Sequence, residues 1–399
     1  MKVLLSKNRL LSGMFLSVLL FSSLVVSVKA EALMWRRTYG GAEIEGAYSL
    51  VETSDGGYAV VGFTSSISVG EGGLLVSSAD FWFVKTDVFG NMEWNQTYGG
   101  AGNDEAFSLV ATSDGGYAIA GRTNSFGDGE YDCWLVKTDA SGNMLWNSTC
   151  GEKQYASETY GTTSEWAHSL VEASDGGYVM AGMGNYTIFV GGDVWLAKTD
   201  EFGNMEWNHT YGGTWHDEAF SLVEASDGGY ALAGSTQLTN STDFWLVKTD
   251  EFGNMEWNHT YGGPGEDVEI ARALVEASDG GYVLTGTAES VGDSVVDSFW
   301  LVKTDAAGNM EWNQTKEKTG YEMAYSLIAT SDGGYAMAGS TYSPSTGDSD
   351  FWLVKTDEFG NAPEAPWVVL PLLVTATLAI LISKKKLLNN HEKSKCIFN

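Results

Sequence analysis

Short apolar runs alternate with turn residues from residue 45 to residue 361, and no sustained helical period interrupts them. In one unit the runs are strand a (218–225), strand b (230–236), strand c (243–249) and strand d (255–261). Each run has the length of a β-strand and is bounded by Gly, Asp, Asn or Ser. Asp-Gly-Gly follows strand a and Gly-Asn follows strand c, and both are typical of tight hairpins. The pattern predicts a four-stranded antiparallel meander.

This unit occurs six times along the chain. Its Ser-Asp-Gly-Gly-Tyr motif ends at Tyr58, Tyr117, Tyr178, Tyr230, Tyr282 and Tyr335. A step of roughly 50–60 residues made only of strands and turns is typical of β-propellers, in which each repeat forms one blade. We therefore predict an all-β fold: a six-bladed β-propeller of four-stranded antiparallel blades over residues 33–361.

Both ends of the repeat array are incomplete. The sixth unit ends at Asn361 without a strand d, whereas Met34-Trp-Arg-Arg-Thr-Tyr39 has the strand d pattern and no unit before it. We expect the N-terminal strand to complete the last blade and close the ring. Closure removes the unpaired edges that an open array would expose.

The turn between strands c and d carries a recognisable motif. Lys-Thr-Asp-x-x-Gly-Asn-x-x-Trp resembles the tryptophan-docking motif of quinoprotein-like (PQQ-type) propeller repeats, and the wider unit is similar to repeats of uncharacterised, archaeal-like prokaryotic surface proteins. The resemblance implies a propeller and says little about activity. It implies inter-blade docking by the strand d tryptophans Trp35, Trp94, Trp146, Trp207, Trp257 and Trp312. We expect the same packing role for the strand c tryptophans Trp82, Trp134, Trp195, Trp245, Trp300 and Trp352. An aromatic sugar-binding platform is the alternative.

The two termini predict export and a membrane anchor. Residues 1–32 have basic residues, an apolar stretch and an Ala-Glu-Ala site, as in a secretory signal peptide, with an uncleaved anchor as the alternative. After a linker (362–366), residues 367–383 are apolar enough for a transmembrane helix, and the lysines that open the tail (384–399) indicate the cytoplasmic side. We expect a single-pass protein of the cell membrane, with the propeller extracellular and the C-terminus cytoplasmic. The C-terminal segment is also similar to the processed sorting tails of archaeal surface proteins.

Sequons for N-glycosylation are frequent in the predicted ectodomain. Five of the seven fall at the same position of strand d, where a glycan would decorate the outer rim of the ring. The alternative is that Asn and Thr are tolerated on an exposed edge strand. The acceptor residues are Asn95, Asn147, Asn185, Asn208, Asn240, Asn258 and Asn313.

The net charge is −30 and the sequence pI is about 4.3. So acidic a domain is not expected to bind nucleic acid. A cation, a glycan or another surface protein remains as a partner, besides the membrane through the C-terminal helix.

Two cysteines of the second blade occupy places where other blades have Phe and Tyr. Cys133 and Cys150 face each other if strands c and d are joined by a four-residue turn, and a three-residue turn with a bulge would shift that register by one. We predict a cross-strand disulfide, consistent with an oxidising compartment. Two free buried thiols are the alternative.

One carboxylate recurs at the start of strand a in all six units. A ring of six acids could hold Ca²⁺ or another hard cation, or a cationic ligand. Alternatively, each acid accepts backbone N–H bonds from its own loop. The six are Glu45, Asp104, Glu165, Asp217, Glu269 and Glu322. Apart from possible Ca²⁺, no cofactor is expected.

A catalytic centre is hard to find in the sequence. His168 and His216 are the histidines of the repeat array outside sequons, and the arginines Arg36, Arg37, Arg122 and Arg272 fall at unrelated repeat positions. We therefore predict a membrane-anchored propeller for binding, adhesion or envelope structure. The alternative is an extracellular carbohydrate-active enzyme, a hydrolase or lyase that uses carboxylates on the face formed by the variable d–a and b–c loops.

Overall fold

The computed structural model describes residues 35–362, except 42, 70–74, 129, 151–154, 158–160, 163, 187–190, 264–266, 291–295, 316–320 and 344–347. The predicted signal peptide, transmembrane helix and cytoplasmic tail lie outside the described residues, as does nearly all of the linker. Within the described part, no helix is long and apolar enough to span a membrane.

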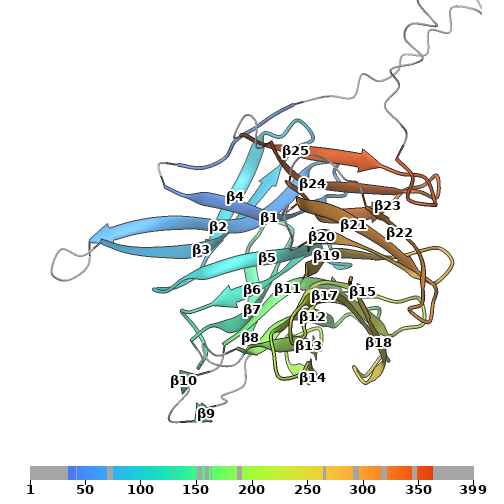
Figure 1. Cartoon of the computed structure of the whole chain (residues 1–399). Coiled ribbons are helices and arrows are strands. Elements are labelled where there is room, and N and C mark those ends of the chain that lie inside the picture. The colour runs from blue at the N-terminus through green and yellow to red at the C-terminus, as the bar shows by residue number, and fades with distance from the viewer. Residues whose placement is uncertain are drawn as a thin grey trace, which may run out of the picture.

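The described chain is built of strands joined by turns, one meander per repeat (Figure 1). The first sheet contains β1 (Glu45–Glu52), β2 (Tyr58–Val69), β3 (Leu75–Thr86) and β4 (Met92–Tyr98). The second contains β5 (Asp104–Ala111), β6 (Tyr117–Thr123), β7 (Asp132–Thr138) and β8 (Met144–Thr149). The third contains β11 (Ser164–Glu172), β12 (Tyr178–Tyr186), β13 (Asp193–Thr199) and β14 (Met205–Tyr211). The fourth contains β15 (Asp217–Glu224), β16 (Tyr230–Gln237), β17 (Thr242–Thr249) and β18 (Met255–Tyr261). The fifth contains β19 (Val268–Glu276), β20 (Tyr282–Ser290), β21 (Val296–Thr304) and β22 (Met310–Thr315), and the sixth contains β23 (Tyr321–Ala329), β24 (Tyr335–Ser343) and β25 (Asp348–Lys355).

Neighbouring strands within each sheet are antiparallel, so the predicted four-stranded blades and their propeller-like arrangement are confirmed. The fourth and fifth sheets are joined by one parallel pair, Thr242 with Val268. A small hairpin of β9 (Tyr155–Ser157) and β10 (Gly161–Thr162) lies between the second and third repeats.

A buried lysine of strand c explains why the turn motifs recur. In the first sheet Lys85 Nζ lies 2.8 Å from Asp55 of the Asp-Gly-Gly turn and 2.9 Å from Glu93 of β4. Asp55 also accepts the backbone N–H of Gly57 at 2.9 Å. Gly56 between them has a φ of 81°, which favours glycine. The lysine thus links both hairpins of a sheet, and Lys137, Lys198, Lys248 and Lys303 make the same contact with the turn aspartate of their own sheets.

The hydrophobic core lies between adjacent sheets, and the strand d tryptophan seals it. Trp94 of β4 covers Gly142 in the c–d turn of the second sheet, where an added Cβ would come within 2.6 Å of the indole ring. Tyr98 donates its hydroxyl to the Gly142 carbonyl at 2.6 Å. Below this contact, Phe83 of the first sheet packs with Tyr117 and Ile119 of the second. Docking of the strand d tryptophan on the next blade is therefore present, as the motif implied.

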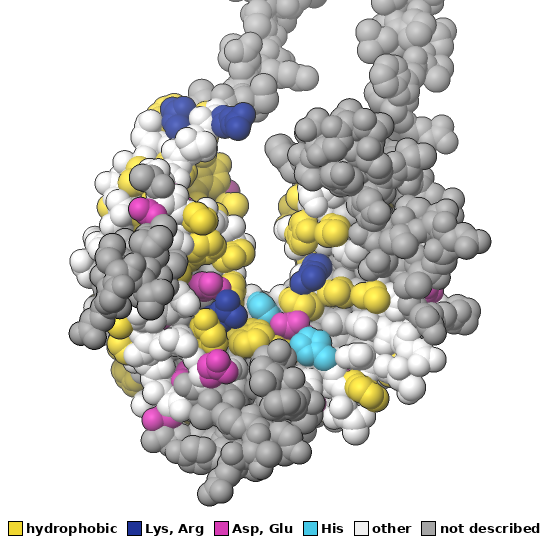
Figure 2. Space-filling view, turned by 60° about the vertical axis from the view of Figure 1, so that its left-hand side comes forward, with side chains coloured by type: hydrophobic (Ala, Val, Ile, Leu, Met, Phe, Trp, Pro, Cys, Tyr) yellow, Lys and Arg dark blue, Asp and Glu magenta, His cyan; other side chains and the backbone are white. Residues whose placement is uncertain are grey.

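The structure differs from the predicted closed ring. Trp35 donates its indole N–H to the Val88 carbonyl at 3.0 Å, and Tyr39 donates its hydroxyl to the Gly90 carbonyl at 2.7 Å, so the N-terminal segment docks on the first sheet as Trp94 and Tyr98 dock on the second. Among the described residues, however, no strand ladder joins this segment to β25, and the sixth sheet has three strands. Docking needs contacts with the first sheet alone, whereas the ladder needs the first and sixth sheets to meet. Figure 2 shows the resulting hollow, open between two arms.

The predicted strand register of Cys133 and Cys150 is confirmed, but the predicted disulfide between them is not present. Trp134 pairs with Thr149, and the Cys150 N–H donates to the Cys133 carbonyl at 2.9 Å, so the two residues are cross-strand neighbours. A bulge next to Thr138 absorbs the shorter turn without shifting this register. Both thiols are free and buried, so the structure does not contain the predicted disulfide.

Candidate functional site

The six recurring acids are each the first or second residue of an a strand. Five of them are buried there: Asp104, Glu165, Asp217, Glu269 and Glu322. Asp104 accepts the N–H of Gly100 at 2.9 Å and Asp217 that of Gly213 at 2.9 Å, which are the backbone contacts expected under the alternative interpretation. Glu45, partly exposed, accepts the N–H of Gly41 at 3.1 Å. Among the described side chains, no three or more His, Cys, Asp or Glu are grouped to hold a metal ion.

A different row of side chains lines the hollow. It consists of the third residue after the recurring acid in each a strand, and we call it the inner row: Tyr48, Phe107, His168, Phe220, Arg272 and Tyr325. Ring centroids are 5.3 Å apart from Tyr48 to Phe107, 5.2 Å from Phe107 to His168 and 5.2 Å from His168 to Phe220. The Arg272 guanidinium lies 4.1 Å from the Phe220 ring centroid. From Tyr48 to Arg272, side chains of five successive blades thus form one continuous contact surface.

Local backbone geometry positions the residues of this surface. In the fourth sheet the register of β15 against β16 shifts between Ala219 and Ser221, which marks a β-bulge. At the bulge Gly234 approaches β15 so closely that a Cβ would lie 1.9 Å from the Glu218 carbonyl oxygen. The recurring strand b glycine is therefore needed to hold the a strand where its second and fourth side chains project from one edge of the sheet.

Glu218 is the centre of a polar cluster on this surface. Its Oε1 lies 2.7 Å from His168 Nε2 and accepts the indole N–H of Trp166 at 3.3 Å, both from the third sheet. Its Oε2 lies 3.4 Å from Nε2 of His216, which precedes β15. We call Glu218, His168, His216 and Trp166 the Glu218 cluster. It joins two histidines to one carboxylate across a blade junction.

These contacts control the charge of the cluster. Burial would raise the pKa of Glu218, but the hydrogen bonds from His168 and His216 outweigh it and hold the pKa well below its usual range. The hydrogen bond to Glu218 raises the pKa of His216 despite partial burial. The carboxylate is therefore ionised at neutral pH, and His216 carries its proton to a higher pH than a free histidine does.

Two arginines flank the Glu218 cluster. Arg122 of β6 pairs with Glu105 of β5 at 2.7 Å and stacks over Tyr131 and Trp166, with its central carbon 4.6 and 5.5 Å from the ring centroids. Arg272 stacks on Phe220, and burial lowers the pKa of its guanidinium. Its Nε is buried without a hydrogen-bond partner. Arg272 therefore has an unsatisfied N–H donor, which must turn toward the hollow to pair with an anionic ligand.

The surface is open to solvent on the side of the hollow. Figure 2 shows basic, acidic and histidine side chains gathered with hydrophobic side chains on the inner wall. His216 keeps 36% of its side chain exposed, and His168 and Arg122 keep 21% and 27%. A ligand in the hollow can reach aromatic faces, a carboxylate-bound imidazole and guanidinium groups together.

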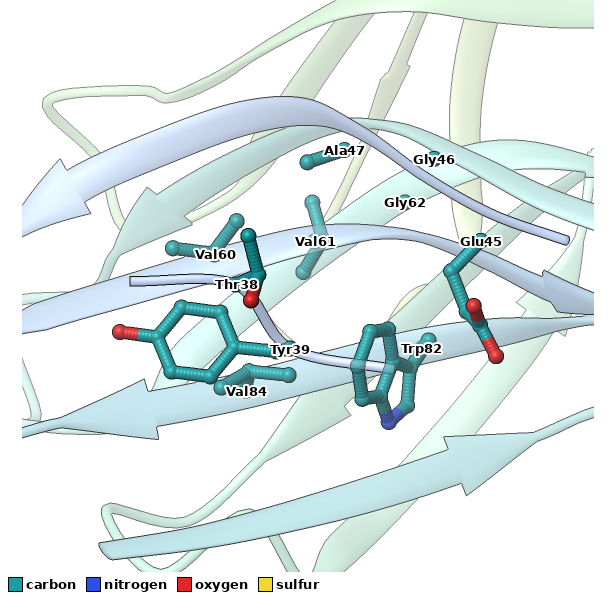
Figure 3. Close-up of a pocket in the computed structure, with 10 residues that line it drawn as sticks. All are labelled: Thr38, Tyr39, Glu45, Gly46, Ala47, Val60, Val61, Gly62, Trp82 and Val84. Atoms are coloured by element: carbon teal, nitrogen blue, oxygen red, sulfur yellow. The ribbon is translucent and has the colours of Figure 1, made fainter. Parts of the chain in front are cut away.

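A cavity of about 270 Å³ lies elsewhere, between the N-terminal segment and the first sheet. Figure 3 shows Tyr39 and Thr38 over Val60 and Val84, with Trp82 beside them. The residues of the second sheet at the places of Val60, Val84 and Trp82 are Ile119, Val136 and Trp134, which are buried against the first sheet. This cavity therefore belongs to an unfilled blade junction and not to a ligand site.

The sequons lie largely where predicted. Asn95, Asn147, Asn258 and Asn313 are exposed on strand d, Asn208 is half-buried there, and Asn240 is exposed in a loop, whereas the Asn185 side chain lies outside the described residues. In four of them Oδ1 accepts the indole N–H of the strand c tryptophan of the same sheet, at 3.1–3.3 Å. These asparagines thus have a structural partner, and glycosylation stays a prediction.

Sequence reasoning missed the inner row and the Glu218 cluster. The available signal was variability at two positions within a constant frame. The first and third residues after the recurring acid change chemical type from blade to blade, whereas the acid itself and the Ala and Leu near them hardly change. His168 and Arg272 share one position of strand a, but Arg122 comes from strand b, and the sequence does not show that neighbouring blades bring these two positions together.

The chain matches no known protein-family model and no curated protein. Among solved structures, a polysaccharide lyase of a new family, the PL25 ulvan lyase, has a TM-score of 0.52 at 10% identity and covers 82% of each chain. The same lyase bound to -[GlcA(1-4)Rha3S]- has a TM-score of 0.50 at 10% identity, again over 82% of each chain. A putative exo-beta-1,3-galactanase from Bifidobacterium bifidum has a TM-score of 0.38 at 11% identity, over 67% of this chain and 94% of that one. At such identities the likeness supports the fold alone, and the quinoprotein-like resemblance stays a prediction.

Proposed function

We propose that the chain is a carbohydrate-active protein that cleaves an acidic polysaccharide by β-elimination at the Glu218 cluster. The observation that carries the proposal is the carboxylate-bound pair His168 and His216 beside the guanidinium of Arg272, whose Nε has no protein partner. The fold similarity to a lyase bound to a GlcA-containing glycan is consistent with this chemistry without establishing it.

Each group has a defined task in the reaction. Glu218 holds Nε2 of His168, so Nδ1 is the basic nitrogen of the neutral ring, as in other carboxylate-oriented imidazoles. Arg272 pairs with the uronate carboxylate and thereby acidifies the C5 proton. His168 removes that proton, the electron pair forms the C4–C5 double bond, and the C4–O4 bond breaks. Protonated His216 returns a proton to O4, and no water is consumed.

Hydrolysis is less well supported by the same residues. A glycoside hydrolase needs one carboxyl group held protonated as the acid and a second held ionised. In and beside the Glu218 cluster, Glu218 is bound by two histidines and Glu105 is paired with Arg122. The contacts of Glu218 hold its pKa well below the usual range, so Glu218 does not suit the role of the acid, and Glu105 is already engaged by the Arg122 guanidinium.

The test is a panel of uronate-containing polysaccharides incubated with the full chain. We expect unsaturated products with ultraviolet absorbance, and a loss of about 10²–10⁴-fold in kcat on His168→Gln. His259→Gln is the matched control. His259 lies on β18, and its Nε2 contacts the Ala307 carbonyl in the turn between β21 and β22, away from the Glu218 cluster. New reducing ends without absorbance would indicate hydrolysis instead. Glycan binding without products would favour a binding module. Either of these results, or the absence of both products and binding, would contradict the proposal.

We also propose that the protein works outside the cell on a membrane anchor formed by residues 367–383, with the predicted signal peptide removed. The support is the sequence pattern of the two termini. Fractionation of cells that express the full chain or a chain ending at Asn361 tests this. The full chain should sediment with membranes and the shorter chain should not, whereas a full chain in the soluble fraction would contradict the anchor.

We further propose that the ring closes as a six-bladed propeller, with the N-terminal segment completing the sixth blade beside β25. The support is the exposure of core positions at both ends of the array. Leu50 is 63% exposed, although the matching Leu222 is 4% exposed. Leu353 is 73% exposed, although the matching Leu246 is fully buried. The exposed faces of the first and sixth sheets would bury each other if the two sheets met.

A further inference from the structure

Carboxylates occur in pairs at the blade junctions, one from each blade. Where strand c of one sheet and strand a of the next begin, the two strands lie side by side, as the parallel pair of Thr242 with Val268 shows. The next residues are Asp243 and Glu269, so their side chains start from adjacent positions. The corresponding junctions of the first three sheets contain Asp80 with Asp104, Asp132 with Glu165, and Asp193 with Asp217.

The junction of the fourth and fifth sheets is the one where charge is least compensated. Asp243 is 8% exposed and Glu269 is 6% exposed. Oδ1 of Asp243 and Oε2 of Glu269 are both buried without a hydrogen-bond partner. Glu269 Oε1 accepts the N–H of Gly263 at 3.4 Å, which is long for a hydrogen bond. Two buried carboxylates that face each other need a proton or a cation between them.

The loop above the pair shows how tightly it is enclosed. A Cβ on Gly262 would lie 2.7 Å from Asp243 Oδ1, and one on Gly263 would lie 3.2 Å from Asp267 Oδ2 and 3.9 Å from Glu269 Oε1. The recurring Tyr-Gly-Gly motif thus leaves room for the carboxylates beneath it. The Asp267 carbonyl also accepts the Thr242 N–H at 3.0 Å, which fixes this loop against the start of β17.

We propose that Asp243 and Glu269 bind a Ca²⁺ ion at the junction of the fourth and fifth sheets. Ca²⁺ takes six to eight oxygen ligands and accepts carboxylates together with backbone carbonyls and water. The two carboxylates would supply the charged ligands, and carbonyls and water would supply the others. The ion cross-links adjacent blades and has no part in the Glu218 chemistry. Its role is therefore independent of the proposed lyase activity.

The fifth junction provides a natural comparison. Ser298 of β21 stands where the other junctions have an aspartate, opposite Glu322 of β23. A single carboxylate leaves no like-charge pair to compensate. We expect no calcium site there, although Glu322 is also buried, with 9% exposed.

The experiment is calcium binding to the chelator-treated full chain, measured by equilibrium dialysis and by thermal unfolding. The native chain should bind Ca²⁺, with a rise in Tm that Mg²⁺ does not reproduce. Asp243→Asn should bind one fewer ion per chain. It should also raise the Tm of the metal-free protein, because the like-charge repulsion is gone. Glu269→Gln serves as the second variant, and Glu322→Gln should leave the number of bound ions unchanged.

Three outcomes would overturn the proposal. The first is no Ca²⁺ binding at millimolar concentration. The second is an unchanged number of bound ions in both Asp243→Asn and Glu269→Gln. The third is a Tm that responds to pH between 5 and 8 but not to Ca²⁺, which would mean that a shared proton, and not a cation, joins the two carboxylates.

Discussion

At the scale of single residues, the same carboxylate chemistry serves three different purposes in this chain. Asp55 and its counterparts are turn residues paired with a buried lysine. Asp243 and Glu269 are a like-charge pair in which Oδ1 and Oε2 have no hydrogen-bond partner among the described residues. Glu218 is a carboxylate that orients two imidazoles. The surroundings, and not the residue type, decide which acid stays charged and which one holds a proton.

The charge on Glu218 sets the titration of its neighbours. Glu218→Gln should lower the pKa of His216, because the hydrogen bond to the carboxylate is the main cause of its raised value. Glu224→Gln on the same strand is the control, since Glu224 accepts the Ser174 N–H and is not part of the Glu218 cluster. Histidine titration by NMR is the measurement. An unchanged His216 pKa in Glu218→Gln would show that the carboxylate does not control the cluster.

Glu269 should make metal-free stability depend on pH. Burial, with Asp243 and Asp267 nearby, raises its pKa to about 7, although the Gly263 N–H opposes the shift. Between pH 5 and pH 7 the native state then keeps a proton that the unfolded state has released. The free energy of unfolding should therefore fall as the pH rises through this window and stay low above it. Urea unfolding in the presence of chelator measures this, and Glu269→Gln should flatten the curve. A native curve that rises over the window would contradict the assignment.

At the scale of secondary structure elements, the strands could be predicted from the sequence because their causes are local. Asp-Gly-Gly and Gly-Asn determine the hairpins, and the apolar runs between them have strand length. Docking of Trp94 on Gly142 followed from a motif that sits within one repeat. Contacts such as His168 with Glu218 could not be predicted, because they depend on how one blade is rotated against the next.

The strand c lysine should be a measurable source of stability. Lys248 is 3% exposed and contacts Asp227 at 2.8 Å and Glu256 at 3.2 Å. Lys248→Met removes both ion pairs and should lower the free energy of unfolding by about 1–3 kcal/mol. Lys137→Met is the comparison, since Leu145 stands where the other sheets have the glutamate and Lys137 keeps only Asp114 as an acidic partner. Its loss should be smaller by about 0.5 kcal/mol. Equal losses in urea unfolding would show that the strand d glutamate contributes nothing.

At the scale of the whole molecule, the free energy of burying the end sheets against each other bears on whether the ring is closed. Five junctions between sheets bury the Leu of strand a, as Leu109, Leu170, Leu222, Leu274 and Leu327 show. At the open ends Leu50 and Leu353 remain in water. Burying a leucine side chain contributes about 1.5–3 kcal/mol, so leaving both faces exposed is costly. The N-terminal segment already occupies its docking place on the first sheet, so closure requires only that β25 approach it.

Ring closure can be decided by placing a charge on the exposed face of the sixth sheet. In a closed ring Leu353→Asp buries a carboxylate in a blade junction and should destabilise the protein as severely as Leu246→Asp in the fourth sheet, by several times the cost of an ordinary surface change. Leu238→Asp, in an exposed loop between β16 and β17, should change the free energy of unfolding by less than about 0.5 kcal/mol. Urea unfolding of the three variants gives the answer directly. If Leu353→Asp behaves like Leu238→Asp, the first and sixth sheets do not meet, and the hollow that holds the Glu218 cluster is open along one side.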